Sequence, residues 1–273
     1  MSALAGAPVW LIGCGNMGGA MLRRWIATGM DPRRVTVVTR GAAELPPGVR
    51  HATVVPGEES PGIVVLAVKP QQLDTVAPLL AQVRPALLVS ILAGVEIAAL
   101  AARIPADAIV RAMPNLPVAI GKGVTALFAD AIDPASRAAA EALAVPLGLV
   151  EWIDDEAQFD AVTALAGCGP GFVFRFADAL ASAGAALGLP PEQAARLAIA
   201  TLAGSAIMAA AAAESPATLA DRVASPGGST RKGLDVLDRE GALVALLTET
   251  LAASARRNAE MAAAARNSPV RPE

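Results

Sequence analysis

Short apolar runs alternate with helical patterns in the first half of the chain. Runs of strand length, rich in β-branched residues, occur at 9–12, 35–39, 63–68, 86–91, 109–113, 124–128 and 149–153. Patterns that fit helices lie between several of them, at 71–82, 97–102 and 134–144. Apolar strands that alternate with helices are typical of a doubly wound parallel sheet. We therefore expect an α/β domain over residues 1–154.

From Asp155 onward the strand pattern stops, and alanine-rich helical patterns replace it. They cover 156–165, 172–187, 191–212, 216–223, 229–238 and 242–266. Pro191 and Pro216 fit helix starts, because proline is favoured in the first turn of a helix. The second half, 155–273, is therefore predicted to be a separate all-α domain.

A glycine motif follows the first strand directly. Gly13-Cys14-Gly15-Asn16-Met17-Gly18 has the form G-x-G-x-x-G, and an amphipathic segment comes after it. In this context Gly13 permits a tight turn, Gly15 lets a pyrophosphate approach the backbone, and Gly18 lets helix and strand pack closely. Free N–H groups at the helix start would bind the phosphates. The motif predicts a Rossmann-like dinucleotide-binding domain, with all six residues at the cofactor.

The end of the second predicted strand bears on which dinucleotide is bound. Sites that prefer NAD usually carry an acidic residue there, whereas this chain has Thr39 and Arg40. A hydroxyl and a guanidinium suit a 2′-phosphate, since arginine binds phosphate with charge-assisted hydrogen bonds. We therefore expect NADPH, with NADH possible; the alternative is that Arg40 is a solvated loop cation.

Small or polar residues close the next three strands at what should be the same sheet edge. They are Ala67-Val68-Lys69-Pro70, Ala93-Gly94 and Asn115. Ligands of doubly wound folds lie along the carboxyl ends of the strands, so we expect these residues at the cofactor as well. His51, the only histidine, falls in a loop-like connection and is assigned no role.

Composition narrows the class of protein. The chain has 273 residues, of which 54% are hydrophobic and 17% charged, and this apolar excess favours burial against a partner subunit. A net charge of −3 argues against nucleic acid or an anionic membrane as a partner. Cys14 and Cys168 are far apart, without metal-ligand spacing, so we expect no metal and a cytoplasmic location.

No targeting or spanning segment is expected from the sequence. The N-terminus lacks a basic region before its apolar run, which argues against a signal peptide. The longest uncharged stretch, 197–213, falls short of the roughly 18 residues that usually span a membrane. A helix at a subunit interface explains this stretch better, and the protein is expected to be soluble.

A loop rich in hydroxyls and glycines separates two of the C-terminal helices. It reads Ser225-Pro226-Gly227-Gly228-Ser229-Thr230. Consecutive glycines let N–H groups point the same way, and the hydroxyls add donors, so a carboxylate fits this environment. The alternative is an ordinary capping turn.

The absence of certain residues favours one type of chemistry. The chain has no tyrosine and no catalytic His–Asp arrangement, whereas carbonyl reduction normally needs a positioned proton donor. A protonated C=N bond accepts hydride with little more than orientation. A dinucleotide site without an obvious general acid therefore points to imine reduction.

Together these motifs resemble pyrroline-5-carboxylate reductases, which make proline. The resemblance runs nearly end to end and is most specific at 223–230 with Gly233 and Leu234. It also covers 66–71, 113–115, 160–163 and 167–170. It implies hydride transfer from NADPH or NADH to the imine carbon of L-1-pyrroline-5-carboxylate.

The resemblance also implies site residues and partners. The substrate carboxylate would lie against Ser225, Gly227, Gly228 and Ser229, and the Thr230 hydroxyl would bond the ring nitrogen as the catalytic contact. Glu156 would lie in the substrate pocket. The helical domain would form a homodimer, which could assemble further into a decamer of dimers.

Other functions remain open at this point. A β-hydroxyacid dehydrogenase shares the two-domain plan, but none of Lys69, Lys122 and Lys232 has the G-x-x-x-K-x-x-x-N context of that class. A different cyclic imine is a possible substrate. A catalytically silent dinucleotide-binding regulator is a third possibility, against which an intact Ser225–Thr230 loop argues.

Overall fold

A computed structural model describes residues 4, 6–41, 44–57 and 59–267 of the chain. It divides into two compact units, one made of residues 1–168 and 254–273 and the other of residues 169–253. The expected boundary after Asp154 marks the end of the strands, and the division between units comes later, at Cys168. Phe159 explains part of this extension, because it is 2% exposed and packs edge-on against Phe128.

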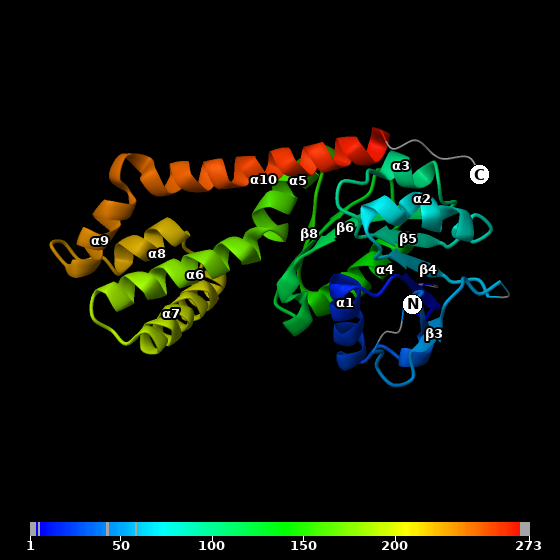
Figure 1. Cartoon of the computed structure of the whole chain (residues 1–273), viewed down its shortest axis with the longest axis horizontal. Helices are drawn as coiled ribbons and strands as arrows, with labels where there is room; N and C mark the ends of the chain where they lie inside the picture. The colour runs from blue at the N-terminus through cyan, green and yellow to red at the C-terminus, as the bar shows by residue number, and fades with distance from the viewer. Residues whose placement is uncertain (1–3, 5, 42–43, 58, 268–273) are drawn as a thin grey trace. The chain divides into compact units, whose positions relative to one another are not determined.

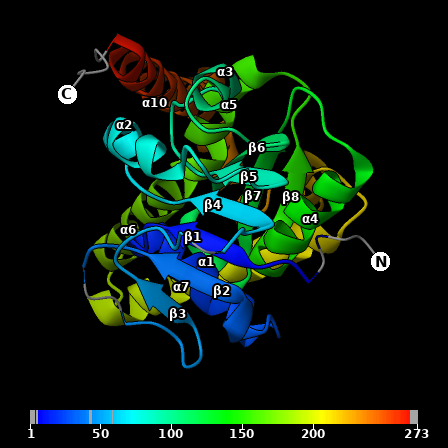
Figure 2. The same ribbon diagram turned by 90° about the vertical axis from the view of Figure 1, so that its right-hand side faces the viewer.

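The first unit contains an eight-stranded sheet with helices on both faces (Figure 1). Figure 2 shows its strands fanning side by side, in the order β3-β2-β1-β4-β5-β6-β7-β8. Their bounds are β1 (Val9–Ile12), β2 (Val35–Val38), β3 (Arg50–Ala52), β4 (Ile63–Leu66), β5 (Leu87–Ser90), β6 (Ala108–Pro114), β7 (Gly123–Phe128) and β8 (Gly148–Trp152). The first six strands are parallel and have the order of a dinucleotide-binding fold, which confirms the predicted fold class.

The sheet departs from the expected parallel arrangement at its far edge. β7 runs antiparallel to β6, and β8 then pairs in parallel with β7. The connection between β6 and β7 spans only Asn115–Lys122, and a parallel crossover needs about a dozen residues or more. A short connection therefore forces the chain to return in the opposite direction.

Two hydrophobic layers cover the sheet, one on each face. The helices of this unit are α1 (Asn16–Ala27), α2 (Leu73–Val76), α3 (Ile97–Ala101), α4 (Pro134–Ala144) and α5 (Phe159–Val162). Trp25 of α1 and Leu143 of α4 belong to one layer, and Leu73 and Leu100 of α2 and α3 belong to the other. The bounds of α4 agree with the sequence-based prediction, and its start is fixed by Asp133, whose side chain accepts from two amides of the first turn.

Two sequence-based expectations for this unit were wrong. The helix expected at 71–82 is broken into 3-10 turns around α2, with Pro70 and Pro78 in the first turns of the flanking segments. His51 lies on strand β3, paired with Val37, and not in an irregular connection.

The second unit is helical. It contains α6 (Gly169–Ala186), α7 (Pro191–Ala211), α8 (Pro216–Arg222), α9 (Ser229–Leu237) and the first part of α10 (Ala242–Asn267), and α6 packs against α7. Its buried apolar side chains are small: among the described residues of this unit they are Ala194, Ala198 and Ala224. Large apolar side chains stay exposed instead, including Phe174, Leu187, Ile207, Met208, Val244 and Leu246. A unit with so little core of its own needs a partner surface.

Helix α7 meets the length and composition expected of a membrane span, contrary to the sequence-based estimate. Its most apolar 18-residue window has a mean hydropathy of 1.6 and is 11% buried. The uncharged stretch 197–213 begins only after Arg196, whereas the helix begins at Pro191 and includes both Glu192 and Arg196. A helix that is buried at a subunit interface would have the same length and apolar composition as α7.

Candidate active site

The glycine fingerprint forms the turn from β1 into α1. Gly13 has φ +88°, and a β-carbon there would lie 2.8 Å from the carbonyl oxygen of Ala67. A β-carbon on Gly18 would lie 3.0 Å from that of Ala67, so the helix packs directly on the end of β4. Gly15 differs, because no atom lies within 4 Å of its missing side chain. The turn is therefore tight on the protein side and open on the side where a ligand would approach.

The first turn of α1 provides hydrogen-bond donors. Its N-cap residue is Gly15, which makes no side-chain cap, so the amides of Asn16 and Met17 belong to the unsatisfied first turn. Burial raises the pKa of the Cys14 thiol, an effect that Arg23 only partly offsets. The Cys14 side chain accordingly packs as a small apolar group against the hydrophobic layer of Trp25 and Leu143.

A cavity of about 450 Å³ opens beside this turn, at the carboxyl ends of the strands. Eight of the predicted cofactor residues line it: Gly13, Cys14, Gly15, Thr39, Arg40, Ala67, Val68 and Lys69. Arg40 is exposed at the end of β2 and makes no ion pair with any described residue. The fold thus brings together three separately predicted loops, with the Arg40 cation at the end of β2.

Other predicted cofactor residues lie along the same edge, outside this cavity. Pro70 follows Lys69 directly, and Ala93 and Gly94 follow β5. Asn115 follows β6, is 7% exposed, and has partners within the protein. Its amide nitrogen donates to the Ala166 carbonyl at 3.0 Å, and its side-chain oxygen accepts from the Val124 amide at 2.8 Å. Asn115 therefore joins β6 to β7 and to the segment before α6.

Glu156, expected in the substrate pocket, lies within the first unit. Its Oε1 accepts from Nη1 of Arg111 at 2.7 Å and from the amide of Ile97 at 2.9 Å. Gly94, Glu96, Arg111 and Glu156 share a second cavity of about 350 Å³. Sequence reasoning missed Arg111, although a lone charge inside the apolar run of β6 was the signal that could have identified it.

The hydroxyl- and glycine-rich loop belongs to the second unit. Gly227 has φ +72°, and Gly228 is the N-cap residue of α9 without a side-chain cap. Ser225, Ser229 and Thr230 are exposed. The Gly228 amide donates to the Ser225 carbonyl at 2.9 Å, which closes the turn, and the amides of Ser229 and Thr230 belong to the unsatisfied first turn of α9. The loop thus has the donors that a carboxylate requires.

Beyond the loop, an ion pair joins the helices on either side. Nη2 of Arg231 lies 2.6 Å from Oδ1 of Asp221, linking the start of α9 to the end of α8. Arg222 pairs with Glu214. In the described part of the chain, no cluster of three or more His, Cys, Asp or Glu side chains could hold a metal ion.

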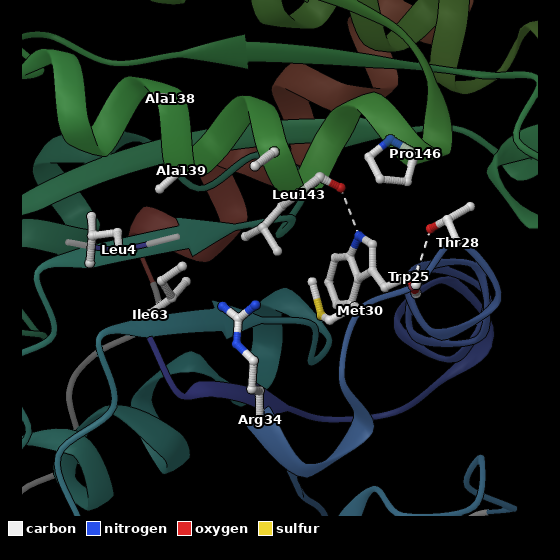
Figure 3. Close-up of a pocket in the computed structure, with 12 residues that line it drawn as sticks. Leu4, Trp25, Thr28, Met30, Arg34, Ile63, Ala138, Ala139, Leu143 and Pro146 are labelled. Atoms are coloured by element: carbon white, nitrogen blue, oxygen red, sulfur yellow. Dashed lines mark hydrogen bonds between the residues drawn. The ribbon is translucent and has the colours of Figure 1, made fainter. Parts of the chain in front are cut away.

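A third cavity lies away from these residues, at the opposite ends of the strands (Figure 3). It encloses about 310 Å³ between α1, α4 and the start of β4, with mostly apolar walls. The Trp25 indole donates to the Leu143 carbonyl at 2.7 Å, and Nη2 of Arg34 donates to the Ala7 carbonyl at 2.9 Å. The polar groups at its wall thus have partners, and the cavity is not part of the candidate site.

Comparison with known proteins places these features in one family. Residues 156–261 match the family model "Pyrroline-5-carboxylate reductase dimerisation", and residues 8–94 match "NADP oxidoreductase coenzyme F420-dependent". The chain is 36% identical over 261 residues to the pyrroline-5-carboxylate reductase of Pseudomonas aeruginosa, covering 92% of this chain and 95% of that protein. It is also 36% identical to the enzyme of Thermus thermophilus, covering 92% and 97%.

Solved structures agree with this result. The pyrroline-5-carboxylate reductase of Coxiella burnetii superposes with a TM-score of 0.82 and 32% identity, covering 93% of this chain and 98% of that one. The enzyme of Plasmodium falciparum, solved with NADP bound, shares the fold with a TM-score of 0.78 at 24% identity, covering 96% and 99%. The likeness therefore extends over both units.

Proposed function

The chain belongs to the pyrroline-5-carboxylate reductase family, and we propose on this basis that it reduces L-1-pyrroline-5-carboxylate to L-proline, the last step of proline synthesis. NADPH, or NADH in its place, supplies the hydride, which adds to the imine carbon as the ring nitrogen takes a proton. The observation that supports this most directly is the fingerprint turn: Gly15 is open to a ligand at the same edge as Arg40 and Lys69.

The first unit is proposed to hold the dinucleotide. The pyrophosphate fits the open side of Gly15, where the amides of Asn16 and Met17 offer donors and the dipole of α1 favours negative charge. Thr39 and Arg40 would bind the 2′-phosphate. Lys69, Pro70, Ala93, Gly94 and Asn115 continue the edge toward the other half of the cofactor.

The second unit is proposed to hold the substrate and the subunit interface. Ser225, Gly227, Gly228 and Ser229 would bind the carboxylate through amides and hydroxyls, and the Thr230 hydroxyl would orient the imine nitrogen. Binding by several fixed donors restricts the ring to one orientation, which is the main requirement of a reaction whose electrophile is already activated.

Homo-oligomerisation follows from the matched dimerisation region and from the exposed apolar side chains of the second unit. We propose a homodimer, with a decamer of dimers as its larger assembly, in the cytoplasm and without nucleic acid or membrane as a partner. Light scattering on the purified protein would give its mass, and a mass equal to one chain would contradict the proposal.

Turnover measurements test the activity. NADPH oxidation should be seen with racemic pyrroline-5-carboxylate and should produce proline. Oxidation that is faster with another cyclic imine would reassign the substrate, whereas reduction of a β-keto acid would favour a β-hydroxyacid dehydrogenase. Cofactor binding without turnover on any of these compounds would favour the regulator.

A further inference from the structure

A partly buried ion pair links strand β6 to the segment before α5. Nη1 of Arg111 lies 2.7 Å from Oε1 of Glu156, and the arginine is 5% exposed. The guanidinium also lies over the ring of Phe159, 4.2 Å from its centroid. A buried arginine that both pairs and stacks has one well-defined position, because its planar group satisfies both contacts only there.

The carboxylate of this pair has a second partner on another element. Its Oε1 accepts from the amide of Ile97, the first residue of α3, at 2.9 Å. Glu96, the N-cap residue of that helix, provides no side-chain cap. Glu156 therefore caps α3 from a distant part of the sequence, and Arg111 neutralises the charge that this cap brings into the interior.

The capped helix begins directly after the turn that closes β5. Gly94 in that turn has φ +71° and lines the same cavity as Arg111 and Glu156. The Ile97 side chain packs in a cluster with Met113 and Phe159, against which Ala93 also packs. The Glu156 segment thus anchors the end of this turn in two ways, through the hydrogen bond to the Ile97 amide and through the cluster that Ile97 shares with Phe159. Leu92 and Val95, on either side of Ala93 and Gly94, are buried in the other hydrophobic layer.

We propose that Arg111 and Glu156 are positioning residues for the cofactor: they fix the start of α3 and, through it, the backbone of Ala93 and Gly94 at the dinucleotide site. This rests on the proposed function, in which that turn contacts the cofactor. It gives Glu156 a different role from the substrate contact that the family resemblance implies. Oε1 already accepts from two donors of its own unit, so its geometry serves the turn.

The two roles predict opposite kinetic results for Glu156→Gln. Glutamine keeps an oxygen for the Ile97 amide but leaves Arg111 without a countercharge. A positioning role predicts that the Kd for NADPH rises about fivefold or more and kcat falls, with the KM for pyrroline-5-carboxylate unchanged. A direct substrate contact predicts the reverse, a raised substrate KM with unchanged NADPH binding, and this result would overturn the proposal.

A matched control is available at the other end of the same strands. Arg84 and Asp107 form an exposed ion pair just before β5 and β6, 2.7 Å apart. Asp107→Asn should leave the Kd for NADPH unchanged. This result would show that the loss of any ion pair on these strands is not enough to weaken NADPH binding. If Glu156→Gln behaves like Asp107→Asn, the pair has only a structural role and the proposal fails.

A double variant covers the case in which Glu156→Gln does not fold. Arg111→Met with Glu156→Gln leaves no unpaired charge in the interior, and it should fold because the neutral pair keeps the acceptor for Ile97. It should bind NADPH more tightly than Arg111→Met alone; equal affinity would contradict the proposed chain of contacts. If the wild-type protein binds NADPH but turns over no substrate, the proposed function is refuted. The NADPH affinities of the variants can still be compared in that case, so the positioning role is tested separately.

Discussion

The α-carbon of Gly13 faces the end of β4 so closely that a β-carbon would lie 2.8 Å from the Ala67 carbonyl oxygen. Gly13 also has φ +88°, a conformation that other residues adopt at a cost. Gly13→Ala should therefore lower the free energy of unfolding by about 2–5 kcal/mol, from strain and overpacking together. Urea unfolding of the protein without cofactor measures this.

Gly15→Ala provides the contrast within the same turn. No protein atom lies within 4 Å of the added methyl group, and φ is −75°. Stability without cofactor should be unchanged, while the Kd for NADPH rises about tenfold or more because the methyl group occupies the approach to the pyrophosphate. A large loss of stability in this variant would contradict the assignment of its open side to a ligand.

The fingerprint and the strand ends were predictable from the sequence because they depend on local patterns. Three features were not. The strand Arg50–Ala52 is short and polar, so it has no apolar run to reveal it. The direction of β7 depends on the length of a connection rather than on its residues. The cap from Glu156 to Ile97 joins residues far apart in the sequence, and only the folded chain shows it.

Arg40 is expected to set the preference between the two nicotinamide cofactors. It lines the cavity at the end of β2, where Arg40→Glu would place a negative charge near the 2′-phosphate. Loss of a charged hydrogen bond of about 1.5–3 kcal/mol predicts a fall of roughly tenfold to a hundredfold in kcat/KM for NADPH relative to NADH. Steady-state kinetics with both cofactors measure the ratio.

Arg33→Glu is the matched control for that variant. Arg33 lies before β2, at the opposite end of the same strand, and pairs with Asp31 on the surface. Arg33→Glu changes the net charge by the same amount as Arg40→Glu, but at a position away from the cavity. If both variants change the cofactor ratio alike, Arg40 acts through the overall field and not through a phosphate contact.

Thr230 is the residue proposed to contact the imine nitrogen, and it is exposed at the start of α9. Thr230→Val keeps the shape and removes the hydroxyl, so kcat should fall about tenfold or more with unchanged NADPH affinity. Thr230→Ser keeps the hydroxyl and should retain most of the activity. Equal rates for the valine and serine variants would show that the Thr230 hydroxyl has no role in the reaction.

The exposed apolar side chains of the second unit should be covered in the oligomer. Phe174 on α6 is 60% exposed, and Phe174→Glu should weaken association because a charge buried at an interface is costly. Ile120→Glu is the control, since Ile120 is 69% exposed in the first unit, outside the matched dimerisation region. Light scattering against concentration should show dissociation for the first variant alone.

Two tryptophans with equal burial differ in the partners of their indole groups. Trp25 and Trp10 are both 0% exposed, but the Trp25 indole donates to the Leu143 carbonyl at 2.7 Å, whereas that of Trp10 has no partner among the described residues. Phenylalanine at either position leaves a similar gap in the core. At Trp25 it also leaves a buried carbonyl of α4 without its donor, and at Trp10 it removes a donor that was unsatisfied.

Trp25→Phe should therefore cost about 1–3 kcal/mol more than Trp10→Phe, the penalty for leaving one polar partner buried and unpaired. Urea unfolding of both variants gives the difference, and an unchanged m-value would show that the unfolded states are comparable. Equal losses would mean that packing alone determines the stability at both sites, and that the bond across the cavity of Figure 3 contributes nothing measurable.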